Sequence, residues 1–231
     1  SIFRDANMGL QIWQERVKKF GLGVRLKTDL PGLKSGLVPT PEFYNKWYGE
    51  NRWAFSTIYS NSIGEGELQV VPLQIANLAA IIANKGYYYQ PHLIKAIGED
   101  SVKRSEFTKK VDTEVDEKYF EPIIQAMYKV VNESGGTARR ARMDSIMVCG
   151  KTGTVQNDPW PDHSVFMAFA PMENPKIAIA VYVEYSDYGG TWAAPISSLM
   201  IEQYLTGEIK RKEKQKRITY AQFLDKSEGK K

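Results

Sequence analysis

Three apolar runs in the second half of the chain constrain its fold more than any other feature. They cover residues 146–155, 165–170 and 177–184. Only short loops separate the runs, and short loops favour antiparallel pairing of consecutive strands. We therefore predict an antiparallel sheet built from these three segments.

The residues on either side of these runs show the spacing of helices. Apolar residues recur at helical intervals over residues 5–20, and residues 116–133 carry one apolar face. The strongest helix prediction covers Gly64–Gly86, which is apolar nearly all round and tolerates Pro72 as a first-turn proline. A last helix is predicted within residues 189–205. Helices followed by three strands and a further helix indicate an α+β fold, with helices packed on an antiparallel sheet.

The other segments before the sheet are predicted to be mostly irregular. Residues 24–56 are rich in proline, glycine and aromatic residues, which indicates an ordered, loop-rich excursion with a short helix near residues 41–47. Residues 87–98 are predicted to be extended. The polar residues 99–113 are predicted to form a surface hairpin or loop.

The composition excludes several classes of protein. The 231 residues are 42% hydrophobic, which allows a sizeable core and argues against disorder throughout. No stretch approaches the roughly 18 apolar residues that span a bilayer, and the N-terminus lacks a signal-peptide pattern. A single cysteine excludes an internal disulfide, and two distant histidines give no metal-ligand spacing, so we predict no metal or cofactor. Because the chain begins with Ser1, we expect it to be a piece of a longer protein.

The basic charge is concentrated at the C-terminal end. Residues 207–231 hold 9 basic and 4 acidic residues, whereas residues 1–206 hold 22 basic and 23 acidic residues. A neutral body has no basic face, so nucleic-acid binding is a poor fit. The run from Lys210 to Arg217 could contact anionic lipid headgroups, but a solvated, partly helical tail is the favoured interpretation.

The first of the three strands carries residues that suit anion binding. Lys151 supplies a positive charge, and Thr152 and Thr154 supply hydroxyl donors. Gly153 has no side chain, so a ligand could lie against the main chain there. If this strand lies at a sheet edge, its unpaired N–H groups could bind an extended peptide or an oxyanion.

A simpler interpretation is that Lys151 and the threonines cover the solvent face of an alternating strand. A Lys-Thr-Gly triplet alone occurs by chance in about one chain of this length in twenty. The presence of Gly150 and Gly153 argues against this interpretation, because glycine weakens a strand interior and needs a reason.

The sequence around the triplet resembles a known family. "CGKTGT" is similar to the third motif of the penicillin-recognising serine acyltransferases. More specifically, the chain resembles the C-terminal part of class B penicillin-binding proteins, and among them the penicillin-binding protein 2 group. The resemblance is collinear over about residues 1–205 and rests on these further segments: "KFGLG", "DLPGLKSGLVP", "SNSIGEGELQVVPLQIANLAAIIANKGYYYQPHLIK", "GGTAR", "DHSVFMAFAP" and "GGTWAAPI".

The resemblance implies a partial transpeptidase fold of the penicillin-binding-protein and serine β-lactamase type over residues 1–206, followed by a flexible basic tail over 207–231. It implies peptidoglycan cross-linking through a serine acyl-enzyme, with stem peptides as substrates and β-lactams as trapped ligands. Lys151 would set the potential around the nucleophile. Thr152 and Thr154 would hold the substrate carboxylate, beside the main chain bared at Gly153, and the Thr154 N–H would form half of an oxyanion hole.

The resemblance also implies a place in the cell and partners. The longer protein would lie on the extracytoplasmic face of the bacterial inner membrane, in the periplasm. It would be anchored by a segment outside this chain and associate with cell-elongation proteins. We expect the fragment alone to be inactive and prone to non-native self-association through an exposed sheet edge.

Two family motifs are missing before the Lys-Thr-Gly strand. The family requires Ser-x-x-Lys and then Ser-x-Asn or Ser-x-Asp, and neither precedes Lys151. Ser227 begins the only Ser-x-x-Lys, but it follows the strand in a charged tail, and we reject it as the nucleophile. We expect the nucleophile to lie before Ser1. The alternative is a degenerate or β-lactam-sensing relative that binds D-Ala-D-Ala-like ligands without turnover.

Three further residues near the motif have open roles. His163 could touch substrate at the rim of the site, or it could make an ordinary surface hydrogen bond. Trp160 could stack on a ligand, although we favour a cap on the core. Cys149 is expected to be a small, inert core residue.

Overall fold

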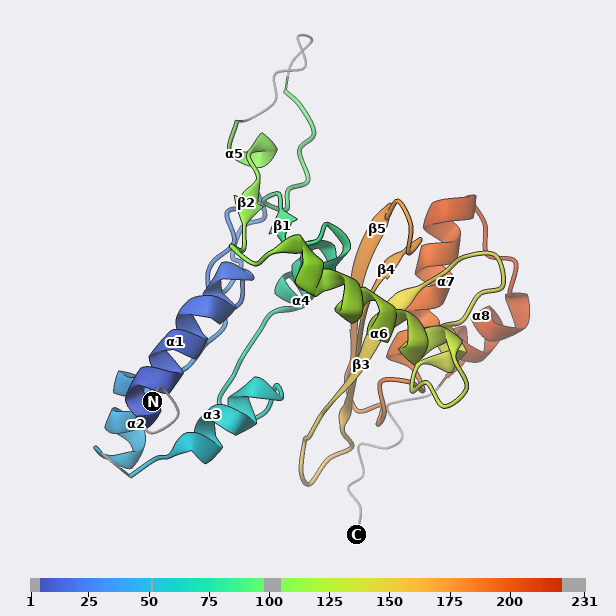
Figure 1. The fold of residues 1–231 in the computed structure, drawn as a ribbon. Coiled ribbons are helices and arrows are strands. Elements are labelled where there is room, and N and C mark those ends of the chain that lie inside the picture. Colours follow the sequence, from blue (N-terminus) through green and yellow to red (C-terminus); the bar gives the residue numbers. More distant parts are fainter. Residues whose placement is uncertain (1–4, 51, 98–104, 222–231) are drawn as a thin grey trace. The chain divides into compact units, whose positions relative to one another are not determined.

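The computed structural model describes residues 5–50, 52–97 and 105–221 (Figure 1). The chain divides into two compact units, one made of residues 1–74 and 87–114 and the other of residues 75–86 and 115–231. Among the described residues, no helix is both long enough and apolar enough to cross a membrane. The proposed boundary at residue 206 stays a prediction.

The second unit contains the predicted antiparallel sheet. Strands β3 (Cys149–Val155), β4 (His163–Ala170) and β5 (Ile177–Val183) pair in the order β3-β4-β5. In this register Lys151 lies opposite Met167, and Gly153 lies opposite Val165. β4 is therefore central, and β3 lies at an edge of the sheet among the described strands. The antiparallel prediction is confirmed.

Helices pack on this sheet as predicted. Helix α6 (Phe120–Asn132), preceded by the short helix η2 (Glu117–Tyr119), packs against β3, and α7 (Ala193–Thr206) packs against β4 and β5. The core between them is made of buried aliphatic and aromatic side chains, including Val131, Val148, Phe166, Ala168, Ile179 and Ile201. The α+β fold class is confirmed.

The helix predicted over Gly64–Gly86 is shorter than expected. Helix α4 spans Pro72–Ala83 and begins at the proline that a first turn tolerates. Gly64 and Gly66 have φ angles of +85° and +70°. A helix excludes this backbone region, so the helical pattern cannot extend back through these glycines.

The N-terminal part of the first unit contains helices α1, α2 and α3 and a small core. Helix α1 spans Ala6–Lys19 and α2 spans Pro41–Tyr48, as predicted, whereas α3 (Phe55–Ser62) was not predicted. The side chains of Asp5 and Thr40 cap α1 and α2 by accepting N–H bonds. The core of this unit is formed by Leu10, Tyr44 and Ile58.

A hydrogen-bonded side chain orders the loops of the first unit. Gln74 is fully buried, and its amide donates to the carbonyl oxygens of Val24 and Ser35, at 2.8 Å each. Within the segment predicted to be extended, residues 87–98, strand β1 (Tyr87–Tyr88) pairs with β2 (Val111–Asp112), and residue 98 lies outside the described residues. Of the predicted polar loop, residues 99–104 lie outside the described residues, and helix α5 spans Ser105–Thr108.

The described part of the basic tail continues the second unit. Helix α8 (Lys212–Thr219) follows α7 after a turn at Gly207, which adopts φ +80°. Helix α8 contacts α7. Ser227 and its Ser-x-x-Lys sequence lie outside the described residues.

Candidate functional site

The two glycines of β3, Gly150 and Gly153, differ in whether packing within the chain requires a glycine at that position. A Cβ atom on Gly150 would lie 2.3 Å from the ring of Phe166, so this glycine is required by core packing. A Cβ on Gly153 would meet nothing closer than Val165 at 3.4 Å, which is an ordinary contact. Packing within the chain therefore explains Gly150 and does not explain Gly153.

The loop before α7 crosses β3 at Gly153. A Cβ on Gly189 would lie 2.4 Å from the carbonyl oxygens of both Gly153 and Val165, and 3.2 Å from the nitrogen of Gly153. These backbone atoms thus face one another between β3 and β4. Because backbone groups alternate in direction along a strand, the N–H and C=O groups of Thr152 and Thr154 point to the outer edge of β3.

The side chains of the motif also alternate. Thr152 and Thr154 share one face of β3, and Lys151 lies on the other. Lys151 is exposed, and its Nζ donates to the carbonyl oxygen of Thr152 at 2.7 Å. The hydroxyl of Thr152 lies 2.9 Å from the hydroxyl of Thr137. An ammonium group, two hydroxyls and outward N–H groups are therefore gathered along one strand edge.

An open pocket of about 450 Å³ lies against the threonine face of β3. Three segments of the second unit form it: the loop after α6, β3, and the loop before α7. Among its described lining residues, the charged ones are Arg139 and Arg140, and both are cations. The pocket is lined by Gly136, Thr137, Arg139, Arg140, Thr152, Thr154, Tyr188, Gly189, Gly190 and Thr191. These donors and positive charges suit an anionic ligand.

Sequence reasoning missed most of the pocket wall. Arg139 is exposed and lines the pocket, although no role was assigned to it from the sequence. The "GGTAR" and "GGTWAAPI" segments were recognised without any role. A Cβ on Gly190 would lie 2.2 Å from the carbonyl oxygen of Thr137, so the two segments touch and need a glycine there. The paired glycines of these two segments were the sequence feature that could have indicated this close contact.

His163 lies at the start of β4, opposite Val155, and is not among the pocket-lining residues. Its Nδ1 accepts the N–H of Tyr185 at 3.0 Å, and its ring contacts those of Tyr182 and Tyr185. A role of His163 in substrate binding stays a prediction. Trp160 is 43% exposed, which does not suit the expected cap on the core.

Cys149 is fully buried, as expected for a core residue. Burial raises the pKa of its thiol to about 12. The thiol therefore stays protonated and unreactive at neutral pH. Within residues 5–50, 52–97 and 105–221, no group of three or more histidine, cysteine or acidic residues could hold a metal ion.

Comparisons with known proteins find matches over most of the chain. A family model described as the penicillin binding protein transpeptidase domain matches residues 3–202. The peptidoglycan D,D-transpeptidase MrdA of Haemophilus influenzae is 31% identical, and the match covers 90% of this chain and 35% of that protein. The chain thus spans about a third of the length of this curated relative.

Two solved structures are also similar. The penicillin-binding protein 2 of Pseudomonas aeruginosa, in complex with WCK 5153, matches with a TM-score of 0.77 and 29% identity, over 94% of this chain and 46% of that one. The penicillin-binding protein 2 of Helicobacter pylori, in complex with MreC, matches with a TM-score of 0.70 and 25% identity, over 85% and 36% of the two chains.

Proposed function

The chain belongs to the penicillin-binding-protein transpeptidase family, within its penicillin-binding protein 2 group, and from this premise we propose specific roles for its residues in a peptidoglycan D,D-transpeptidase. The observation that carries the proposal is the edge of β3. There an ammonium group, two hydroxyls and outward main-chain donors border a cationic pocket.

The reaction we propose is acyl transfer through a serine ester. The serine Oγ attacks the carbonyl carbon of the D-Ala–D-Ala bond, and its proton passes to a base. The C–N bond then breaks, D-alanine leaves with a proton on its nitrogen, and an acyl-enzyme remains. An amine of a neighbouring strand attacks the ester, forms the new amide and returns the serine hydroxyl.

The residues of β3 take distinct roles in this proposal. The hydroxyls of Thr152 and Thr154 bind the terminal carboxylate, and the outward N–H of Thr154 supports the developing oxyanion. Loss of one such donor typically raises the barrier by roughly 2.7–4 kcal/mol. Lys151 supplies positive potential beside the nucleophile. The bare main chain at Gly153, which no internal packing requires, lets the substrate lie against the strand.

The nucleophile is proposed to lie outside residues 1–231. No Ser-x-x-Lys precedes Lys151, and the chain spans about a third of its curated relative. The longer protein would act on the outer face of the cytoplasmic membrane. A partnership with elongation proteins draws support from the relative solved with MreC. The alternative, a relative that binds such ligands without turnover, differs by lacking a reactive serine.

Labelling with a fluorescent penicillin tests the proposal. We expect the intact protein to be labelled covalently and residues 1–231 alone to remain unlabelled. A folded intact protein that takes no label would favour the non-catalytic alternative. Label on residues 1–231 would contradict our rejection of Ser227, and peptide mapping would identify the residue.

A further inference from the structure

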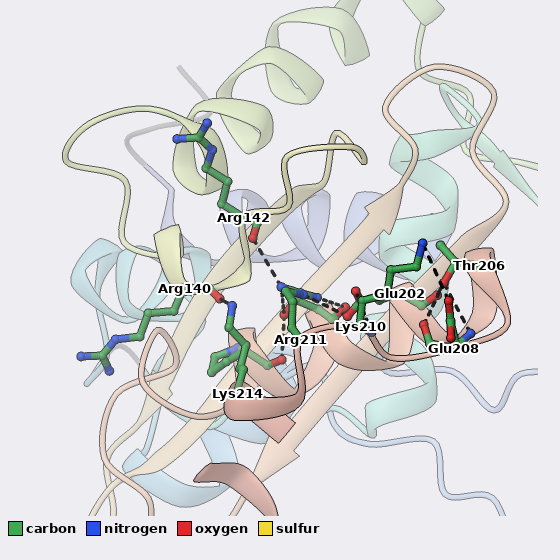
Figure 2. Close-up of polar contacts among 10 residues, drawn as sticks. Arg140, Arg142, Glu202, Thr206, Glu208, Lys210, Arg211 and Lys214 are labelled. Carbon is green, nitrogen blue, oxygen red and sulfur yellow. Dashed lines mark hydrogen bonds and ion pairs between the residues drawn. The ribbon is translucent and has the colours of Figure 1, made fainter. Parts of the chain in front are cut away.

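The basic segment after α7 is joined to the pocket wall by hydrogen bonds (Figure 2). Figure 2 shows Arg211 between Glu202 of α7 and the main chain of Arg142, and Lys214 directed at the main chain of Arg140. Residues 139–141 form the short helix η3 (Arg139–Ala141). The two cationic side chains therefore reach the segment that carries both arginines of the pocket.

Arg211 is held firmly enough to act as an anchor. Its Nε donates to Oε2 of the buried Glu202 at 2.9 Å, and its Nη2 donates to the carbonyl oxygen of Ser198 at 2.7 Å. A buried carboxylate needs a charged, hydrogen-bonded partner, and Arg211 meets that need. A third contact runs from Nη1 to the carbonyl oxygen of Arg142, at 3.4 Å. One guanidinium thus joins α7 to the chain just after η3.

Lys214 makes the direct contact with the pocket wall. Its Nζ donates to the carbonyl oxygen of Arg140 at 2.7 Å. The last carbonyls of a helix have no partner within it, and basic side chains commonly satisfy them. Burial, followed by the charge of Arg211, lowers the pKa of this ammonium. Lys214 therefore gives up part of its hydration to hold this contact.

The segment also contacts a residue adjacent in sequence to another part of the pocket lining. Arg217 lies 5.0 Å from the ring centre of Trp192, which directly follows the lining residue Thr191. Other basic residues of the segment are engaged locally, since Lys210 pairs with Glu208 and Lys216 with Glu213. These contacts favour an internal role over binding to a lipid surface.

We propose that Lys214, held in place by Arg211 and Glu202, is a positioning residue that fixes the Arg139–Arg140 wall of the substrate pocket. Loss of its contact with the Arg140 carbonyl leaves η3 free to shift, and the two guanidinium groups then spread over more positions. Ligand binding weakens, while the chemical step at the serine is unchanged. The inference rests on the proposed function for the identity of the ligand, but not for the ordering of η3.

The test compares three variants of the intact protein. Lys214→Met removes the donor, and Lys214→Arg keeps one. Lys212→Met is the control, because Lys212 is an exposed lysine of the same helix whose side chain makes no hydrogen bond or ion pair among the described contacts. For penicillin acylation, we expect Lys214→Met to raise the half-saturating penicillin concentration roughly three- to tenfold. The limiting acylation rate should stay within about twofold. Lys214→Arg and Lys212→Met should resemble the wild type.

Amide hydrogen exchange supplies an arm that needs no activity. Lys214→Met should speed exchange in residues 139–142 and leave β4 unchanged, even if the wild type takes no penicillin. Wild-type inactivity would thus overturn the proposed function alone. If Lys214→Met matches Lys212→Met in both half-saturation and exchange, the positioning role is wrong. If Lys214→Met does not fold, Lys214→Gln is compared with Lys212→Gln by the same criteria.

Discussion

The crossing of Gly189 over Gly153 leads to a sharp prediction about Gly189→Ala. The added Cβ would lie 2.4 Å from the carbonyl oxygens of Gly153 and Val165. Favourable contacts of carbon atoms lie at roughly 3.5–4.0 Å, so the loop before α7 would have to move by about 1 Å. Both obstacles are main-chain atoms of paired strands, which cannot rotate away as a side chain could.

We expect Gly189→Ala to lower the free energy of unfolding by about 1–3 kcal/mol, the usual cost of overpacking. The same displacement would move Tyr188–Thr191, which line the pocket, and so weaken penicillin acylation of the intact protein. Urea unfolding and acylation kinetics measure the two effects. The prediction links stability and activity because one steric contact determines both.

Gly153→Ala is the matched control, because it adds the same methyl group where the nearest atom is Val165 Cβ at 3.4 Å. Alanine is preferred to glycine in a strand interior, so stability should be unchanged or higher by up to about 1 kcal/mol. Acylation should still fall if the substrate lies against this strand. The reasoning is refuted if Gly189→Ala unfolds at the wild-type urea concentration, or if the two variants lose equal stability.

Two further predictions concern single side chains of β3. Lys151→Ala in the intact protein should slow acylation while the thermal unfolding midpoint stays near the wild type. The reason is that the Lys151 side chain is exposed and, among its described contacts, bonds only to the Thr152 carbonyl. An unchanged acylation rate would count against its role. Cys149 should resist a thiol-alkylating reagent at about pH 9 in the native protein and react once urea unfolds it, because burial raises its pKa from an ordinary value of about 8.5 to about 12. The stabilisation linked to this raised pKa is complete below the unfolded pKa and is lost as pH rises towards 12. Rapid alkylation of the native protein would contradict the prediction, because it would show that the thiol is accessible.

The sheet and its main helices could be predicted from sequence because their signals are local. The apolar runs and short loops around β3, β4 and β5 specify antiparallel neighbours. Helix α3 escaped prediction because Phe55–Ser62 is mostly polar, with Ile58 as its buried apolar residue. The start of α4 was misplaced because composition does not reveal a positive φ at Gly64 or Gly66.

The pocket could be predicted only in part, since its walls come from three segments far apart in the sequence. The charge and glycine content of Lys151–Thr154 indicated a binding strand from the sequence alone. Gly153 could not be separated from Gly150 without knowing that the Phe166 ring covers only the latter. Thr137 and Gly190 can be assigned to the pocket wall only because they contact each other, and a single sequence does not reveal that contact.

The contacts of the basic tail have a signal in the sequence. Glu202 is the one charged residue of helix α7, and it is buried. A carboxylate in such a helix requires a cation within reach, because an unpaired buried charge would cost several kcal/mol. The turn at Gly207 brings Arg211 back to that carboxylate. A single acidic residue on a buried helix that is followed by a basic run therefore predicts that the run folds back. It also predicts that the run's cations bind within the protein before any of them can meet a membrane.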